Sequence, residues 1–259
     1  MSLAIIAITT HGLSVAGKLQ EKLNADLYAP GNIIDGDLSK ITPYKTTTKK
    51  LIEEIWPRYN SFVFIMALGI VTRIIKDHIQ NKYKDPAIVV VDEMGRYALS
   101  ALSGHEGGAN RLAEKVALIC LGDFVITTGS EATKTLIVGM GCRRGTSVDR
   151  LEETFLNGLK KIGRDVNEVR LIASVEDKSD EQGLFKLSEK FNIPLKFISK
   201  KLIKTVEDNF TKSETVKKAL GIYSVAEPCA QLGGFRCQII LPKTKYTQTT
   251  IAIAEEKFL

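Results

Sequence analysis

The amino-acid sequence predicts an α/β protein made of two α/β domains, each with a mostly parallel sheet flanked by helices. Short apolar runs alternate with amphipathic segments along the whole chain, which is typical of β-α-β units. The opening, "LAIIAITTHGLSVAGKLQEKLNADLYAP", has the pattern of a strand, a turn, a helix and a second strand, which favours parallel pairing. A small, polar stretch, "GSEATKT", lies between two apolar strands and indicates a boundary between domains 1–133 and 134–259.

In the first domain an amphipathic segment around 49–56 follows the opening unit. "SFVFIMALGIVTRIIKDHI" predicts a buried strand, a turn at Gly69 and a helix from about Ile70. "AIVVVDEMGRYALSAL" predicts two strands joined by a turn at 93–96. A glycine-rich loop, a helix to about Cys120 and the strand "FVITT" complete the domain.

The second domain restarts the pattern with the strand "LIVGM". The helix "SVDRLEETFLNGLKKI", the strand "VRLIASV", the helix "DEQGLFKLSEKF" and the strand "PLKFI" follow in turn. Two or three short helices are expected in 200–232, and the strands "CQIILP" and "TIAIAE" end the chain. Repeats of fixed period and low-complexity tracts are absent from the sequence.

Composition is that of an ordinary soluble globular protein, with 44% hydrophobic and 25% charged residues among 259. No apolar run approaches the length of a membrane span, and the N-terminus lacks the pattern of a signal peptide. The four cysteines have no CxxC spacing, which argues against a zinc site or a disulfide framework. We therefore expect a cytoplasmic protein that does not associate with membranes.

The net charge of +6 is carried by the second half of the chain. Residues 1–133 hold 14 basic and 14 acidic side chains, whereas residues 134–259 hold 22 and 16. Such asymmetry fits either a domain that faces an anionic partner or a lysine-rich solvated surface. Nucleic acid is disfavoured, because no binding motif is present and the basic residues are spread along the chain.

Four strand-to-helix segments contain glycine and are candidates for binding anions: 9–12, 67–73, 103–110 and 139–147. Ligands of open α/β sheets bind where strands end and helices begin, since the free N–H groups there attract negative charge. The glycines fit neither GxGxxG nor a phosphate-binding P-loop, which disfavours a nucleotide-binding regulatory protein.

The segment "SGHEGGAN" at 103–110 places His105 and Glu106 between Gly104 and the pair Gly107–Gly108. It is not the zinc motif HExxH, because position 109 is alanine. Histidine titrates near neutrality and the pKa of a glutamate can be raised, so both are plausible acid–base groups. A tight turn with a surface histidine explains the pattern equally well, and both interpretations stay open.

The segment "GMGCRRGTS" presents Arg143 and Arg144 in a loop suited to binding carboxylates, with Thr146 or Ser147 as the helix N-cap. A solvated basic loop is the alternative. Cys142 reads as a small buried cysteine, because no histidine follows residue 105.

Five further residues are weaker candidates. His11, in the turn "TTHG", could face the same cleft as His105. Thr72 and Arg73 lie near the start of their helix, and Arg73 could be merely solvated. Lys243 and Lys245, in the connection between the last two strands, could form a basic rim for an anionic ligand or simply a solvated turn.

Four segments together resemble one known family: "IMALGIVTRIIKDHI", "PAIVVVDEMGRYALSALSGHEGGANRLAEKVA", "VGMGCRRGTS" and "SVAEPCAQLGG…LPKTK…TIAIA". They are similar, in the same order, to the cobalamin biosynthesis protein G family, the cobalt-precorrin-5A hydrolases of anaerobic vitamin B12 synthesis. Members often carry a middle segment between the "VITT" and "VGxGCRRG" strands. Here only "GSEATKT" connects them, so this chain resembles a compact two-domain form.

The resemblance implies a hydrolase that opens the δ-lactone of a ring-contracted cobalt-corrinoid and releases acetaldehyde, giving cobalt-precorrin-5B. It implies His105 and Glu106 as the acid–base pair and the N–H groups of Gly107 and Gly108 as oxyanion donors. The remaining candidate residues would bind substrate: Gly104, Asn110, His11, Thr72, Arg73, Arg143, Arg144, Lys243 and Lys245.

The basic second domain would close over the substrate's carboxylates. No cofactor or resident metal is expected, since the substrate carries the cobalt. Neighbouring pathway enzymes and a second copy of the chain are further expected partners, while nucleic acid and membranes are not. The alternative function is a non-catalytic carrier that shields a corrinoid intermediate.

Overall fold

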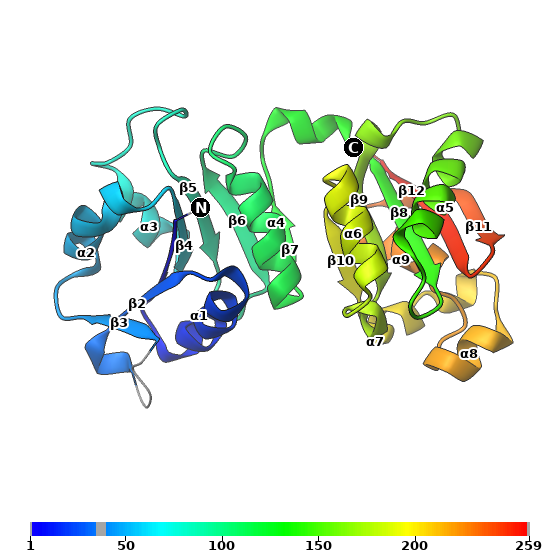
Figure 1. Cartoon of the computed structure of the whole chain (residues 1–259), viewed down its shortest axis with the longest axis horizontal. Helices are drawn as coiled ribbons and strands as arrows, with labels where there is room; N and C mark the ends of the chain where they lie inside the picture. The colour runs from blue at the N-terminus through cyan, green and yellow to red at the C-terminus, as the bar shows by residue number, and fades with distance from the viewer. Residues whose placement is uncertain (1, 35–39, 258–259) are drawn as a thin grey trace. The chain divides into compact units, whose positions relative to one another are not determined.

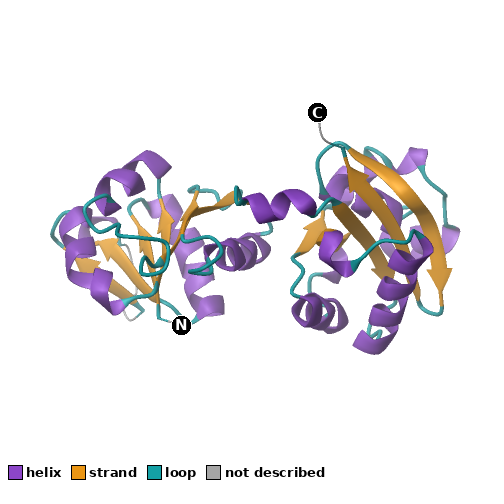
Figure 2. Ribbon diagram, turned by 90° about the horizontal axis from the view of Figure 1, so that it is seen from above, coloured by secondary structure: helices purple, strands orange, loops and turns teal. Residues whose placement is uncertain are grey.

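The computed structural model describes residues 2–34 and 40–257, which form two compact units that divide between Thr128 and Gly129. The boundary expected from the sequence, after residue 133, falls at the end of the short 3₁₀ helix Gly129–Thr133. In each unit the strands of one sheet lie between helices, so the predicted α/β fold class is confirmed (Figures 1 and 2). None of the helices described is both long and apolar enough to cross a membrane.

The first unit contains a seven-stranded sheet in the order β3-β2-β1-β4-β5-β6-β7. Neighbouring strands are parallel except β5 and β6, which form an antiparallel hairpin. Gly95 lies in the turn of this hairpin with a φ of 69°, where the sequence placed it. The strands are β1 (Leu3–Ala7), β2 (Asp26–Pro30), β3 (Ile41–Tyr44), β4 (Ser61–Ile65), β5 (Ala87–Val91), β6 (Tyr97–Leu102) and β7 (Asp123–Val125).

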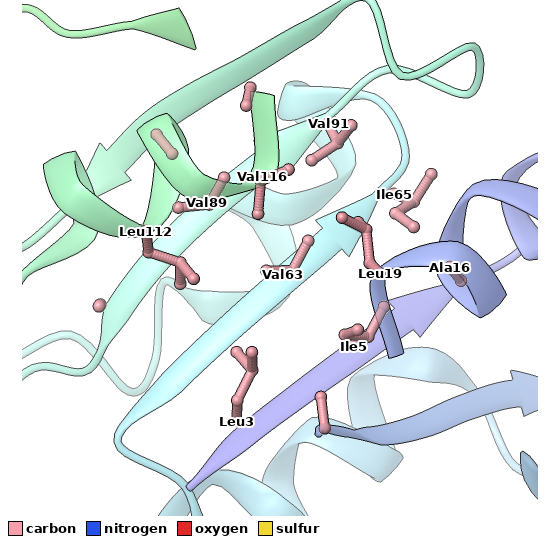
Figure 3. Packing of buried hydrophobic residues seen from close by; sticks show 14 of the residues in the cluster. Leu3, Ile5, Ala16, Leu19, Val63, Ile65, Val89, Val91, Leu112 and Val116 are labelled. Carbon is pink, nitrogen blue, oxygen red and sulfur yellow. The ribbon is translucent and has the colours of Figure 1, made fainter. Parts of the chain in front are cut away.

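In the described part of this unit, four α-helices cover the sheet, two on each face. α1 (Thr10–Leu23) and α4 (Ala109–Cys120) pack on one face, and α2 (Thr48–Ile55) and α3 (Leu68–Ile75) on the other. Figure 3 shows the first of these cores, where Leu19 of α1 and Leu112 and Val116 of α4 meet apolar side chains of β1, β4 and β5. These central strands are buried throughout, which explains their continuous apolar runs.

The second unit contains a five-stranded sheet in the order β10-β9-β8-β12-β11. β8, β9 and β10 are parallel, whereas β12 runs antiparallel to both β8 and β11, so only half of the ladders in this sheet are parallel. The strands are β8 (Leu136–Cys142), β9 (Val169–Val175), β10 (Leu195–Ile198), β11 (Cys237–Tyr246) and β12 (Thr249–Glu256).

One buried helix, α9 (Ala226–Gly233), crosses the second sheet, and α5 (Val148–Lys161) and α6 (Gln182–Phe191) pack together elsewhere on the unit. Glycine permits the close approach of α9: a Cβ on Gly139 of β8 would lie 1.9 Å from the Ala226 carbonyl oxygen. The short helices expected in 200–232 are α7 (Lys200–Lys204), α8 (Glu214–Leu220) and α9.

Candidate functional site

The glycine-rich loop 103–108 lies at the edge of the first sheet where the parallel strands β1–β5 begin. β6 runs antiparallel to β5, so its last residue, Leu102, pairs with Ile88 near the start of β5. A Cβ on Gly107 would lie 3.5 Å from the backbone nitrogen of Ala87, the first residue of β5. The loop follows the carboxyl end of β6, but β6 and β7 run opposite to β1–β5, so the loop does not share an edge with those after β1 and β4.

His11 lies at the opposite, carboxyl edge of the same sheet. It is an exposed residue of the first turn of α1, not part of a turn before it, and Thr9 caps that helix by accepting the Gly12 N–H at 3.1 Å. A five-residue strand spans roughly 16 Å, so His11 does not face the same site as His105.

Thr72 and Arg73 lie in α3, which also begins at the carboxyl edge, after β4. The Thr72 hydroxyl donates to the carbonyl of Leu68, and the Arg73 guanidinium donates to that of Gly69. Both side chains are exposed and bonded within their own helix. The structure does not bring them together with His105 and Glu106.

Backbone hydrogen bonds hold the 103–108 loop in shape. The carbonyl of Ser103, whose φ is 55°, accepts the N–H groups of Gly107 at 3.1 Å and Ala109 at 3.2 Å. Because the Gly107 N–H is used in this way, it is not available as an oxyanion donor. A Cβ on Gly107 would lie 2.5 Å from the Cβ of Ser103, so glycine is required for this turn.

Asn110 attaches the loop to its surroundings. Its side-chain oxygen accepts the Ser100 hydroxyl at 2.8 Å, and its side-chain nitrogen donates to the Thr128 hydroxyl at 3.0 Å. A Cβ on Gly104 would lie 2.7 Å from that same oxygen. The amide predicted to bind substrate is therefore engaged in positioning the loop.

His105 and Glu106 are both exposed at the tip of the loop. A carboxylate oxygen of Glu106 accepts a hydrogen bond from Lys82 Nζ at 2.7 Å. That hydrogen bond, reinforced by the Lys82 charge, lowers the pKa of Glu106. This shift is opposite to the raised pKa that suits a glutamate in acid–base work.

In the second unit, Arg143 and Arg144 occupy the loop that follows β8, at the carboxyl edge of β8 and β9. Arg144 forms an ion pair with Asp180 at 2.7 Å, whereas the Arg143 guanidinium is exposed and has no ion pair within the described residues. The N–H of Gly145, in the same loop, donates to the carboxylate of buried Glu181 at 3.0 Å. Arg143 is thus the more available of the two arginines.

Lys243 and Lys245 lie within β11 and not in the turn after it, which contains Gln248. The Arg143 N–H donates to the carbonyl of Gln248 at 3.0 Å, so the arginine loop and the β11–β12 turn share one edge. Lys243 Nζ donates to the carbonyl of Thr211 at 3.0 Å, and burial lowers the pKa of Lys243. Lys245 is exposed.

Cys142 ends β8 beside this loop. Burial raises the pKa of its thiol to about 11, so little thiolate forms at neutral pH and the residue is a poor nucleophile. Across residues 2–34 and 40–257, no three His, Cys, Asp or Glu side chains are grouped in a way that would hold a metal ion.

Sequence reasoning missed several residues of these sites. Lys82 and Glu181 act through contacts between segments distant in sequence, and nothing local marks them. Ser224 and Glu227, buried at the start of α9, do carry a signal: Ser-x-x-Glu before a helix is the capping-box pattern.

Two family models match this chain, and together they cover most of it. The model described as "Cobalamin synthesis G N-terminal" matches residues 50–131, and the one described as "Cobalamin synthesis G C-terminus" matches residues 136–254. A solved structure, a putative cobalamin biosynthesis protein G homolog from Sulfolobus solfataricus, covers 99% of this chain and 97% of its own, with 19% identity and a TM-score of 0.38.

Curated relatives are similar over nearly the whole chain. A cobalt-precorrin-5A hydrolase of Priestia megaterium is 24% identical over 97% of this chain and 94% of its own length. One of Salmonella typhimurium is 23% identical over 89% and 91%. The first alignment spans 352 positions and this chain has 259 residues, so at least 93 positions of that relative have no counterpart here. On the two adjoining model matches, the chain belongs to the cobalamin biosynthesis protein G (CbiG) family.

Proposed function

We propose that this chain is a cobalt-precorrin-5A hydrolase of anaerobic cobalamin biosynthesis. One observation carries the proposal: relatives that bear this name align with nearly all of the chain and more than nine-tenths of their own length. The specific reaction proposed is the opening of the substrate's δ-lactone followed by release of acetaldehyde.

The reaction has two stages with different proton requirements. In the first, water loses a proton and adds to the lactone carbonyl, the ester C–O bond breaks, and the departing alkoxide takes up a proton. In the second, that hydroxyl is deprotonated, a C–C bond breaks, acetaldehyde leaves and the ring carbon is protonated. Each stage needs a group that accepts a proton and returns it, and neither requires a cofactor beyond the cobalt that the substrate brings.

His105 is the proposed acid–base group of the 103–108 loop. Its exposure at the tip of a loop fixed by Ser103 and Asn110 supports this role, since a rigid loop positions the imidazole. Glu106 is paired with Lys82, which lowers its pKa, so it is less suited than His105 to accepting a proton. The Gly108 N–H is the proposed oxyanion donor, because the Gly107 N–H already donates to the carbonyl of Ser103.

Arg143 and Lys245 are the proposed contacts for the substrate's acetate and propionate side chains. Both are exposed cations of the second unit. Arginine binds carboxylates through two parallel hydrogen bonds, so Arg143 would fix orientation as well as attract charge. Arg144 and Lys243 would contribute less, because each already has a partner in the protein.

Incubation of the purified chain with cobalt-precorrin-5A tests the proposal. We expect stoichiometric acetaldehyde, measured by coupling to alcohol dehydrogenase and NADH. A His105→Ala variant should lower turnover by about 100-fold or more, which is the usual contribution of a positioned acid–base group. Tight binding of the substrate without any acetaldehyde would instead indicate the carrier function.

A further inference from the structure

The start of helix α9 holds two buried polar side chains, each with one oxygen that has no hydrogen-bond partner among the described residues. Ser224 is 0% exposed and Glu227 is 5% exposed. Within the described residues, neither Ser224 Oγ nor Glu227 Oε2 has a hydrogen-bond partner. A buried polar group left unpaired costs about 1–3 kcal/mol, so two such groups at one helix start are unusual and call for a reason.

The sequence Ser-x-x-Glu would allow both side chains to accept backbone N–H groups at the start of the helix, but the structure does not show these hydrogen bonds in the part of the chain that it describes. In a capping box the serine accepts the N–H three residues on, and the glutamate accepts the N–H of the serine. Here Val225 is the N-cap residue, and among the described residues no side chain makes a capping hydrogen bond. A conflict between a local pattern and the structure is expected mainly where function requires it.

The other oxygen of Glu227 fixes the orientation of its carboxyl group. Glu227 Oε1 accepts the N–H of Lys243 at 3.2 Å. That N–H is free of the β11–β12 ladder because the register shifts between Leu241 and Thr244, around Pro242. The carboxyl group is therefore held by one oxygen while the other is left without a partner.

Ser224 and Glu227 lie at the edge of the sheet where α/β proteins commonly bind ligands. A Cβ on Gly141 of β8 would lie 3.6 Å from Val225, so the N-terminus of α9 lies near the carboxyl end of β8. Ligands of α/β sheets bind at that edge, and a helix N-terminus there favours developing negative charge.

Lys245 lies on the same face of the sheet. Thr249 points toward α5, because its hydroxyl bonds that of Thr154. Side chains alternate along a strand, so Thr250 and its ladder partner Lys245 point to the opposite face, which α9 covers. A buried carboxyl group, a hydroxyl and an exposed ammonium group thus belong to one corner of the second unit.

We propose that Glu227, oriented by Lys243 and aided by Ser224, is the base that activates water for the first stage of the reaction, the opening of the lactone. Its Oε2 accepts a proton as the water oxygen bonds to the carbonyl carbon. The carbonyl electron pair moves to oxygen, near the N-terminus of α9 and Lys245. When the ester C–O bond breaks, Glu227 returns the proton to the departing oxygen.

This inference rests on the proposed function and adds a residue that the family resemblance did not suggest. The surroundings of Glu227 also differ from those of Glu106, the other glutamate considered as a base. Glu106 is exposed and paired with Lys82, whereas Glu227 is buried and its Oε2 has no hydrogen-bond partner among the described residues.

The test compares Glu227→Gln with Glu207→Gln in single-turnover experiments on cobalt-precorrin-5A. Glutamine keeps an oxygen to accept the Lys243 N–H but cannot take a proton, so the fold should persist. Glu207 is a matched control, because it is also buried in the second unit and its carboxylate accepts the Tyr223 N–H at 2.6 Å. We expect Glu227→Gln to slow acetaldehyde release by about 100-fold or more with little change in substrate affinity, and Glu207→Gln to match the wild type.

Mass spectrometry of the corrinoid separates the two stages. Glu227→Gln should leave the substrate unchanged, whereas His105→Ala should accumulate a species heavier by one water, the opened lactone. Wild-type rates in Glu227→Gln, or accumulation of the opened lactone in that variant, would overturn the inference and leave the proposed function intact. Absence of acetaldehyde from the wild type would overturn both.

Discussion

Glu106 and Glu227 are both glutamates close to a helix start, and their neighbours give them different properties. Glu106 is exposed and bonded to Lys82, which stabilises its charged form. Glu227 is buried; one of its oxygens accepts a backbone N–H, and the other has no partner in the part of the chain that the structure describes. The motif around Glu106 attracts attention in the sequence, but contacts from distant segments decide which carboxyl group is free to act.

Replacing Lys82 tests the account of Glu106. Lys82→Gln should raise the pKa of Glu106 toward its ordinary value, as measured by carboxyl NMR titration. Because the folded pKa is lowered, the pair stabilises the protein above the ordinary glutamate pKa, and this contribution is lost as pH falls through the lowered value. The melting temperature of the variant should therefore lie slightly below that of the wild type at neutral pH and converge with it in acid. Lys84→Gln, a nearby exposed lysine, is the control, and an unchanged Glu106 titration in Lys82→Gln would contradict the assignment.

Gly107 allows the tight turn of the 103–108 loop, and a substitution there measures how much the turn depends on glycine. Gly107→Ala should destabilise the protein by about 1–3 kcal/mol in urea denaturation, since the new Cβ would contact Ser103 at 2.5 Å. Gly17→Ala is the control, because nothing lies within 4 Å of its Cβ and alanine favours the helix. Equal stability of the two variants would show that the loop can rearrange at little cost.

At the scale of elements, strand direction decides which loops share an edge. The order and type of most helices and strands follow from apolar periodicity, because buried central strands read as continuous apolar runs. The hairpin between β5 and β6 is also predicted by the turn at Gly95, and it reverses the direction of β6. Reversing one strand moves the loop after it to the other edge, and this separates His105 from His11 and Arg73.

Other differences between the structure and the elements expected from the sequence also come from contacts that apolar periodicity does not report. Strand β3, Ile41–Tyr44, lies at the edge of the sheet, with two of its four residues exposed, so it lacks the apolar run that marks the central strands. Lys243 and Lys245 look like turn residues, but β11 continues beyond both of them to Tyr246, with a register shift between Leu241 and Thr244. Contacts such as Lys82 with Glu106 join residues far apart in sequence, and periodicity carries no information about them.

The packing of α9 on β8 gives a prediction at this scale. In Gly139→Ala the new Cβ would meet backbone atoms of Ala226 and Ala230, which cannot move without displacing the helix. We expect a loss of about 3 kcal/mol or more in chemical denaturation. Gly129→Ala, with nothing within 4 Å of its Cβ, should change the free energy of unfolding little; a tolerated Gly139→Ala would contradict the close approach of α9.

At the scale of the whole molecule, the two halves of the chain differ in net charge, and the second half carries the excess of basic residues. The sequence alone located the excess of basic residues in the second half, and the structure shows which of them remain available. Arg144 is paired with Asp180 and Lys243 donates to a carbonyl, whereas Arg143 and Lys245 are exposed. Net charge therefore overstates the number of cations free to meet an anionic ligand.

Salt dependence of substrate binding tests this view. The dissociation constant for cobalt-precorrin-5A should rise as ionic strength increases, because exposed charges are screened beyond about 10 Å at 0.1 M salt. Arg143→Ala should weaken binding and flatten the salt dependence more than Arg144→Ala does. Equal effects of the two substitutions would show that the ion pair with Asp180 opens on binding.

Each of the two sheets is complete on one side of the connector Gly129–Thr133: β1–β7 precede it and β8–β12 follow it. A gene that gains or loses a stretch of sequence at this point would therefore encode a protein in which every strand keeps its neighbours. Longer relatives and this shorter chain can then share both halves while differing by at least 93 alignment positions, provided that the added residues enter here. For protein engineering, the same connector is a natural site for inserting a reporter domain.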